Sequence, residues 1–152
     1  MMSREVVLVD GIRTAFGRSG EDGFFWHTRA DDMVVKVIRE ILRRNPEVAP
    51  DMIEENLWGA TVQEKDQGLT LGRSTALLAG LSEMCAGASI DRMCAGGMTA
   101  VTTAASEIAL GAFDIAIAGG VEHMGHHPIG ATADPNPRFL VERLVSEDAL
   151  VM

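Results

Sequence analysis

Hydrophobic positions follow two different periods along the first 120 residues of the chain. Short apolar runs at 5–10, 57–62, 88–91 and 113–118 are typical of buried strands. Apolar residues at helical spacing predict helices over 31–44, 68–80 and 95–111, and a short helical turn begins near Asp51. Strands and helices therefore alternate. This order predicts an α/β fold, with a mainly parallel sheet and helices on both of its faces.

The periodic pattern ends at Gly120. The following stretch, VEHMGHHPIGATADPNPRF, is rich in Gly, Pro, Asp and His and has no regular period. We therefore expect residues 1–120 to form one α/β domain, and residues 121–152 to belong to an irregular loop region.

Composition and charge narrow the class of protein. The chain has 152 residues, of which 47% are hydrophobic and 23% charged, as in ordinary globular proteins. A net charge of -9 and scattered basic residues disfavour nucleic acid as a partner. No run approaches the roughly 18 apolar residues of a membrane span, and the N-terminal stretch MMSREVVLVDG lacks a cleavable apolar region. We expect a cytoplasmic, reduced protein that binds neither membrane nor nucleic acid.

The tetrapeptide MCAG occurs twice and contains both cysteines, Cys85 and Cys94. Cys94 directly precedes the predicted helix 95–111, where the helix dipole favours a thiolate and the Cys94 backbone N–H is a candidate oxyanion donor. Cys85 precedes a strand and is interpreted as a small apolar filler. An extended 88–91 places their α-carbons more than about 20 Å apart, too far for a disulfide. At this point Cys94 is either a nucleophile or an inert buried thiol.

The predicted helix 95–111 has an unusual composition. Its sequence, AGGMTAVTTAASEIALG, is mostly Ala, Gly, Ser and Thr with few charges, which predicts a helix surrounded by protein. Gly96 and Gly97 in its first turn each cost about 1 kcal/mol of helix stability relative to alanine. They predict that another backbone approaches the start of this helix.

Three histidines, His123, His126 and His127, form an H-x-x-H-H pattern after the last predicted strand. Three interpretations are open: part of a metal site, a base for Cys94, or solvated loop residues. Zinc sites normally have three or four ligands, and the segment offers no third ligand of evident spacing. We therefore expect no metal and favour solvated loop residues. The base interpretation stays open because ligands bind at the edge where parallel strands end.

Four stretches of the sequence together resemble the N-terminal half of thiolases, the enzymes that make or cleave β-ketoacyl-CoA. They are VLVDGIRTAFGR (7–18), GATVQEKDQG (59–68) continuing into GRSTALLAGL (72–81), SIDRMCAGGMTAV (89–101) and DIAIAGGVEHM (114–124). The resemblance implies a thiolase-like fold with a buried nucleophile helix, and it places the family's nucleophilic cysteine on Cys94. It further implies acyl transfer through a cysteine thioester. Coenzyme A or acyl-CoA is then a substrate, and no cofactor is covalently bound. The resemblance also implies a homodimer that pairs through residues 89–92, or a larger homo-oligomer if further apolar surface is exposed.

The chain also departs from the family pattern. Residues that differ from the usual ones are Ala15, Leu69, Thr70, Asp91, Gly96 and His123. The C-terminal half, with the family's second cysteine and its oxyanion-hole asparagine and histidine, is missing, and Val151 and Met152 fall where the family's inserted loop region begins. We therefore expect an N-terminal portion that is inactive alone. Two alternatives are a β-ketoacyl synthase-like enzyme and a non-catalytic assembly or binding module. Dinucleotide binding is disfavoured because no G-x-G-x-x-G follows the first strand.

Overall fold

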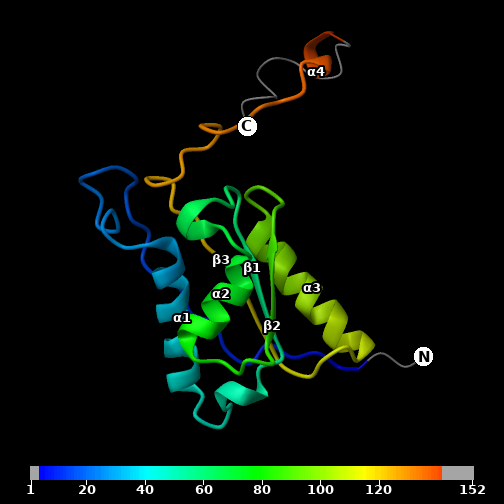
Figure 1. Ribbon diagram of the computed structural model, residues 1–152. Coiled ribbons are helices and arrows are strands. Elements are labelled where there is room, and N and C mark those ends of the chain that lie inside the picture. The colour runs from blue at the N-terminus through cyan, green and yellow to red at the C-terminus, as the bar shows by residue number, and fades with distance from the viewer. Residues whose placement is uncertain (1–3, 142–152) are drawn as a thin grey trace.

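The computed structural model describes residues 4–141 of the chain, and it has the layered arrangement that the alternating pattern predicts (Figure 1). Its strands are β1 (Glu55–Gly59), β2 (Ala86–Ile90) and β3 (Ala116–Gly120). Its helices are α1 (Ala30–Arg44), α2 (Leu71–Ala79), α3 (Gly96–Leu110) and α4 (Arg138–Val141), with the 3-10 turns η1 (Pro50–Met52) and η2 (Lys65–Gln67). Within this part of the chain, no helix is long and apolar enough to cross a membrane.

The three strands form a parallel sheet in the order β2-β1-β3. Leu57 in the central strand β1 lies opposite Ala88 of β2 and Ala118 of β3. Leu57 and Trp58 are each 4% exposed, as expected for a strand covered on both faces. The prediction of a parallel α/β fold is therefore confirmed.

Helices α1 and α2 cover one face of the sheet. The apolar stripe of α1 buries Val34 and Ile38 in a core that also contains Trp58 and Leu71. Acidic residues in the first turn of α1 and arginines in its last turn match the helix dipole. This side of the molecule agrees closely with the predicted helices 31–44 and 68–80.

A buried asparagine joins the central strand to α2. The Asn56 side chain is fully buried, and its amide donates hydrogen bonds to the Gly72 carbonyl at 2.6 Å and to the Thr75 hydroxyl at 3.2 Å. Its carbonyl oxygen accepts a hydrogen bond from the Trp58 indole at 2.7 Å. Because every polar atom of this buried side chain has a partner, the network sets the position of α2 against β1.

Helix α3 covers the opposite face of the sheet, but only one of its own faces is buried. Gly96, Ala100 and Ala104 form the buried stripe, which packs against β1 and β3. Met98 and Leu110 are 68% and 78% exposed. The expectation of a helix surrounded by protein is thus met on one face only. Among residues 4–141, no second layer packs on the outer side of α3.

The first predicted strand, residues 5–10, is absent from the structure. Val7, Leu8 and Val9 are between 71% and 85% exposed and form no ladder with β1, β2 or β3. A strand needs a hydrogen-bonded neighbour, and this segment pairs with none of the strands among the described residues. The prediction of a buried strand at 5–10 is therefore wrong for the described chain: the apolar run is present in the sequence, but it is neither paired nor buried.

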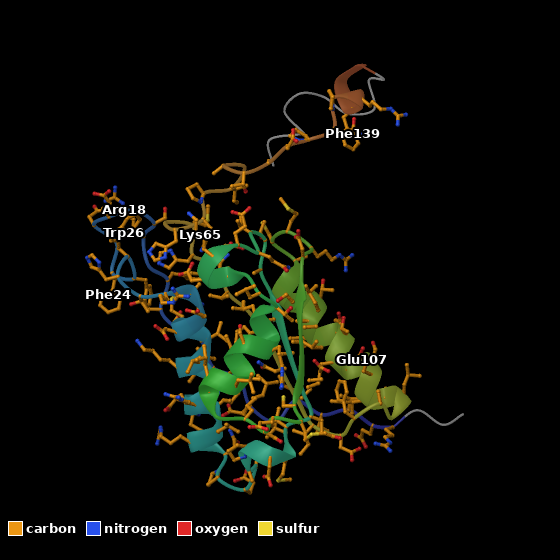
Figure 2. All side chains as sticks on the ribbon, in the orientation of Figure 1. Arg18, Phe24, Trp26, Lys65, Glu107 and Phe139 are labelled. Carbon is orange, nitrogen blue, oxygen red and sulfur yellow. The ribbon has the colours of Figure 1, made fainter. Side chains whose placement is uncertain are left out.

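Strand boundaries and the C-terminal region also differ from the prediction. The strand β1 begins and ends before the predicted 57–62, and β3 begins later than the predicted 113–118. After β3 the chain forms turns, as the irregular pattern indicated, until the short helix α4, which was not predicted. Phe139 of α4 lies apart from the α/β layers (Figure 2). Val151 and Met152, at the predicted start of an inserted region, lie outside the described residues.

Candidate active site

Cys94 lies in a tight turn that connects β2 to α3. Met93, directly before it, has a φ of 49°, a left-handed conformation that is costly for a residue with a side chain. The Asp91 carboxylate accepts a hydrogen bond from the Met93 backbone N–H at 3.0 Å and so stabilises the turn. Ala95 is the N-cap of α3, which places Cys94 one residue before the cap. Asp91, the acidic residue near the predicted nucleophile, therefore stabilises the turn that carries Cys94.

The start of α3 is held by backbone-to-backbone contacts between glycines. A Cβ added to Gly59, the last residue of β1, would lie 2.6 Å from the Gly96 carbonyl oxygen and closer still to the Gly96 carbonyl carbon. A Cβ on Gly120, the last residue of β3, would lie 3.0 Å from the Gly97 Cα. The predicted close approach of another backbone is confirmed. The carboxyl ends of β1 and β3 therefore determine where the first turn of α3, and hence Cys94, is placed.

The two cysteines differ in accessibility. Both are free; Cys94 is exposed, whereas Cys85 is 1% exposed and donates a weak hydrogen bond to the Ala86 carbonyl. Burial raises the pKa of the Cys85 thiol. The absence of a disulfide and the filler role of Cys85 are as predicted. Of the two thiols, only that of Cys94 is accessible to solvent.

A loop after β3 carries the three histidines and docks onto η2. The Gln67 side chain is fully buried, accepts a hydrogen bond from the His123 backbone N–H, and donates one to the Glu122 carboxylate at 2.8 Å. His123 Nε2 lies 3.0 Å from the Phe25 carbonyl oxygen, and its Nδ1 accepts the His126 backbone N–H at 3.1 Å. In these two contacts Nε2 of His123 is the hydrogen-bond donor and Nδ1 is the acceptor.

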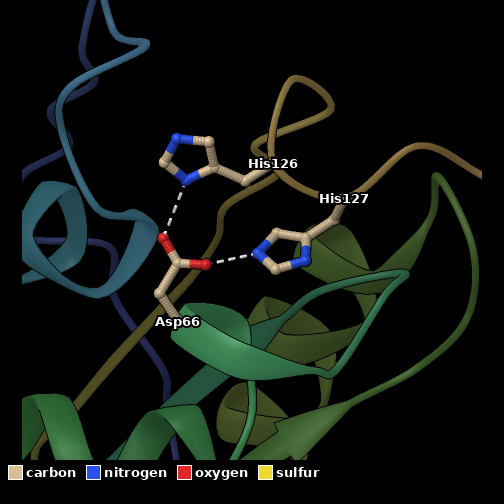
Figure 3. Close-up of side chains that lie close together, drawn as sticks. All are labelled: Asp66, His126 and His127. Atoms are coloured by element: carbon tan, nitrogen blue, oxygen red, sulfur yellow. Dashed lines mark hydrogen bonds and ion pairs between the residues drawn. The ribbon is translucent and has the colours of Figure 1, made fainter.

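Asp66 of η2 is the centre of a second set of contacts (Figure 3). Its carboxylate accepts the Ala30 N–H at the start of α1 at 2.9 Å, faces His126 Nδ1 at 3.1 Å, and makes a short contact with His127 Nε2. Burial alone would raise the pKa of Asp66. The hydrogen bonds from Ala30, His126 and His127 outweigh burial and hold the pKa of Asp66 far below its usual value.

These contacts change the interpretation of the histidines. His123 and His127 are 6% and 3% exposed, so the expectation of solvated loop residues is wrong for both. In the part of the chain that the structure describes, their side chains bond to η2 and to the loop before α1, and none hydrogen-bonds Cys94. Sequence reasoning missed Asp66 because it lies 60 positions from His126 and belongs to no local pattern.

A cavity of about 680 Å³ lies between the N-terminal segment 8–18 and the outer edge of β3. Its walls include Val34, Trp58 and Ile117, which also belong to or pack against the core, and Cys94 is not among its lining residues. We therefore assign it to incompletely filled core beside an unpaired strand edge, and not to the candidate active site.

The fold and the site together define a parallel α/β protein with a cysteine exposed at the N-terminus of a helix that is anchored on strand ends. Residues 6–152 match the family model for the thiolase N-terminal domain. The chain belongs to the thiolase family.

Individual relatives agree with this assignment. The chain is similar to a 3-ketoacyl-CoA thiolase of Idiomarina loihiensis, with 42% identity over 134 residues, covering 88% of this chain and 34% of the relative. A 3-ketoacyl-CoA thiolase of Aliivibrio salmonicida is 44% identical over 131 residues, or 86% of this chain and 34% of the relative. The chain thus spans about a third of the length of the curated relatives it matches.

Solved structures show the same fold. The acetyl-CoA acetyltransferase of Bacillus anthracis matches with a TM-score of 0.65 and 28% identity, over 78% of this chain and 32% of that one. A thiolase from Ascaris suum, solved in complex with coenzyme A, matches with a TM-score of 0.68 over 80% of this chain and 31% of that one. Its identity of 21% supports the fold alone.

Proposed function

We propose that this chain is the N-terminal portion of an acyl-CoA C-acyltransferase, with Cys94 as its nucleophile. The observation that carries the proposal is the exposed Cys94 thiol, placed before the first turn of α3 by the glycine contacts with β1 and β3. The relatives named as 3-ketoacyl-CoA thiolases support the reaction class. Residues 121–152 would then begin the region that the family inserts into its first half.

The proposed chemistry passes an acyl group through a cysteine thioester. In the condensing direction the Cys94 sulfur attacks the carbonyl carbon of an acyl-CoA, and the carbonyl oxygen becomes an oxyanion. The backbone N–H of Cys94 is the candidate donor to that oxygen. Collapse of the intermediate breaks the carbon–sulfur bond to coenzyme A, which leaves as the thiol with the proton that Cys94 gave up. In a Claisen condensation, the α-carbon of a second acyl-CoA loses a proton and attacks the thioester carbonyl, and Cys94 leaves as the thiol with that proton. In the reverse direction, Cys94 attacks the β-keto carbonyl of a β-ketoacyl-CoA, the carbon–carbon bond breaks, and the released acyl-CoA takes the proton of Cys94 on its α-carbon. The thiol of coenzyme A then takes the acyl group from Cys94 in thiolysis.

The two alternatives to this function are a β-ketoacyl synthase-like enzyme and a non-catalytic binding module. A β-ketoacyl synthase-like enzyme would use a cysteine at the same kind of helix, but the relatives above are thiolases. A non-catalytic binding module is favoured by one observation: no acid–base side chain hydrogen-bonds Cys94 within residues 4–141. Release of the acyl group to coenzyme A needs such a group.

Acylation and turnover separate these functions experimentally. The 152-residue chain is incubated with acetyl-CoA while protein mass and free coenzyme A are followed. We expect slow, single acylation of Cys94 and no sustained turnover, since a missing base and missing oxyanion donors each cost rates of about 100-fold or more. Label should persist in Cys85→Ala and vanish in Cys94→Ala. Acylation of Cys85, or no acylation at all, would contradict the proposed nucleophile.

We also propose that the chain pairs with a second copy through β2. This strand is at one edge of the sheet, so one side of its backbone is open to a further strand. Sedimentation of the chain should then give a dimer, and a stable monomer at high concentration would contradict this interface.

Two free cysteines support a reducing, cytoplasmic location.

A further inference from the structure

Asp66, His126 and His127 form a compact cluster where η2, the loop after β3 and the start of α1 meet (Figure 3). One ligand atom from each residue lies within 4.8 Å of the other two. The side chains of Asp66 and His127 are 7% and 1% exposed, whereas that of His126 is 26% exposed. The cluster therefore presents two imidazole nitrogens and a carboxylate in a site that opens to solvent beside His126.

Both ring nitrogens of His126 face hydrogen-bond acceptors, although an imidazole with one N–H can donate to only one of them. Nε2 lies 2.7 Å from the Trp26 carbonyl oxygen, which can only accept, so this nitrogen carries the proton. A ring with this single proton would have a lone pair on Nδ1, yet Nδ1 faces the Asp66 carboxylate at 3.1 Å. Two acceptors that face each other repel unless a cation or a second proton lies between them.

The surroundings of the cluster orient its side chains in advance. The Trp26 carbonyl accepts the hydrogen on His126 Nε2, and this contact turns Nδ1 toward the Asp66 carboxylate. His123 stacks on the same ring, with centroids 3.7 Å apart and planes inclined by 15°. The Ala30 N–H donates a hydrogen bond at 2.9 Å to Asp66 Oδ2, the same oxygen that faces His126. Metal ligands in proteins are typically positioned by outer partners of this kind.

We propose that Asp66, His126 and His127 bind a divalent transition-metal ion, and that this ion is Zn²⁺. Imidazole together with a single carboxylate suits zinc better than the oxygen-only ligand sets of calcium or magnesium. Zinc bonds of about 2.0–2.1 Å in a tetrahedron place neighbouring ligand atoms about 3.3 Å apart, close to the 3.1 Å between His126 Nδ1 and Asp66 Oδ2. The short contact between His127 Nε2 and Asp66 Oδ1 has to lengthen when the ion binds. The fourth position faces the opening at His126 and takes a water molecule.

The bound ion would join three segments that are distant in sequence: η2, the loop after β3 and, through Asp66 and Ala30, the start of α1. The earlier expectation of no metal rested on local spacing, which lacked a third ligand; the fold brings Asp66 to that place. The inference is independent of acyl transfer by Cys94.

Titration of the metal-free 152-residue chain with zinc chloride at neutral pH tests the proposal. Calorimetry should give one zinc per chain. Zinc at about 100 times its dissociation constant should raise the melting temperature by about 5 to 10 °C. Cobalt(II) in place of zinc should give the visible absorption of a tetrahedral site. A folded chain that binds no zinc under these conditions would show that the cluster is only an ion pair of imidazolium and carboxylate, and would overturn the proposal.

Variants then locate the ion. His127→Gln should weaken zinc binding by about 100-fold or more, because it removes a ligand from a set of three. His27→Gln is the matched control, since His27 is the exposed histidine outside the cluster. Cys94→Ala should also retain the affinity of the parent. Circular dichroism checks that each variant is folded. Binding that survives His127→Gln but is lost in Cys94→Ala would place the zinc on the thiol and refute the site.

Discussion

Replacing Gly59 by alanine tests whether the carboxyl end of β1 positions the nucleophile turn. The added Cβ would lie 2.6 Å from the Gly96 carbonyl oxygen and still closer to the Gly96 carbonyl carbon and the Gly97 nitrogen. These are backbone atoms, which cannot rotate away as a side chain can. Gly59 does not have a positive φ, so alanine at this position meets no backbone penalty of its own. The effect of Gly59→Ala is therefore purely steric.

The expected loss lies at the upper end of the range for overpacked cores, about 3 kcal/mol of unfolding free energy. For a chain of this length, such a loss lowers the melting temperature by about 6 to 12 °C. Gly97→Ala is the matched control at the same contact. Its Cβ would lie 3.4 Å from the Gly120 Cα, an ordinary contact. Alanine also favours the helix by up to about 1 kcal/mol, so Gly97→Ala should be neutral or stabilising.

Urea unfolding of the parent and both variants measures the differences in unfolding free energy. The rate of Cys94 alkylation under native conditions reports whether the turn has moved. Gly59→Ala should displace the first turn of α3 and change the rate of alkylation, whereas Gly97→Ala should leave the rate unaltered. If Gly59→Ala is as stable as the parent, the close approach of β1 and α3 is wrong. If it is unstable but the alkylation rate in the remaining folded protein is unchanged, β1 does not position Cys94.

Three other predictions concern the two cysteines, Glu55 and Asn56. Iodoacetamide should modify Cys94 at least about 10-fold faster than Cys85 at neutral pH, because Cys85 is buried and burial raises the pKa of its thiol; peptide mapping that finds the reverse order contradicts this. Burial, and then the charge of Glu107, raise the pKa of Glu55 above 4.5, so the folded state loses stability as pH rises through this raised pKa. Glu55→Gln should therefore unfold at higher urea than the parent at pH 7, and the two should converge below about pH 4; an equal or lower midpoint at pH 7 argues against the shift. Asn56→Ala should cost about 3 kcal/mol in urea unfolding, since it leaves the buried Trp58 indole N–H without its partner and removes two hydrogen bonds to α2; a loss under about 1 kcal/mol would show that water replaces the amide.

Local sequence determined the elements whose stability depends on their own residues. The apolar stripe from Val34 to Ile38 and the dipole-matched charges around it specify α1, and Gly80 and Gly111 end α2 and α3 in left-handed conformations. The position of Cys94 before a helix was readable for the same reason, because it depends only on where a helix begins. Gly96 and Gly97, which follow Cys94, predicted the close backbone contact that the structure shows.

Tertiary structure decided whatever depends on a distant neighbour. Residues 5–10 have the composition of a strand but remain unpaired, because a strand needs hydrogen bonds from another segment. Helix α3 carries few charges, yet its outer side is exposed, and no segment among residues 4–141 packs on it. The site around Asp66 depends on η2 meeting a loop 60 residues later. No local sequence period predicts this contact. It arises because β1 and β3 are parallel neighbours, so that η2 after β1 and the histidine loop after β3 both start at the same edge of the sheet.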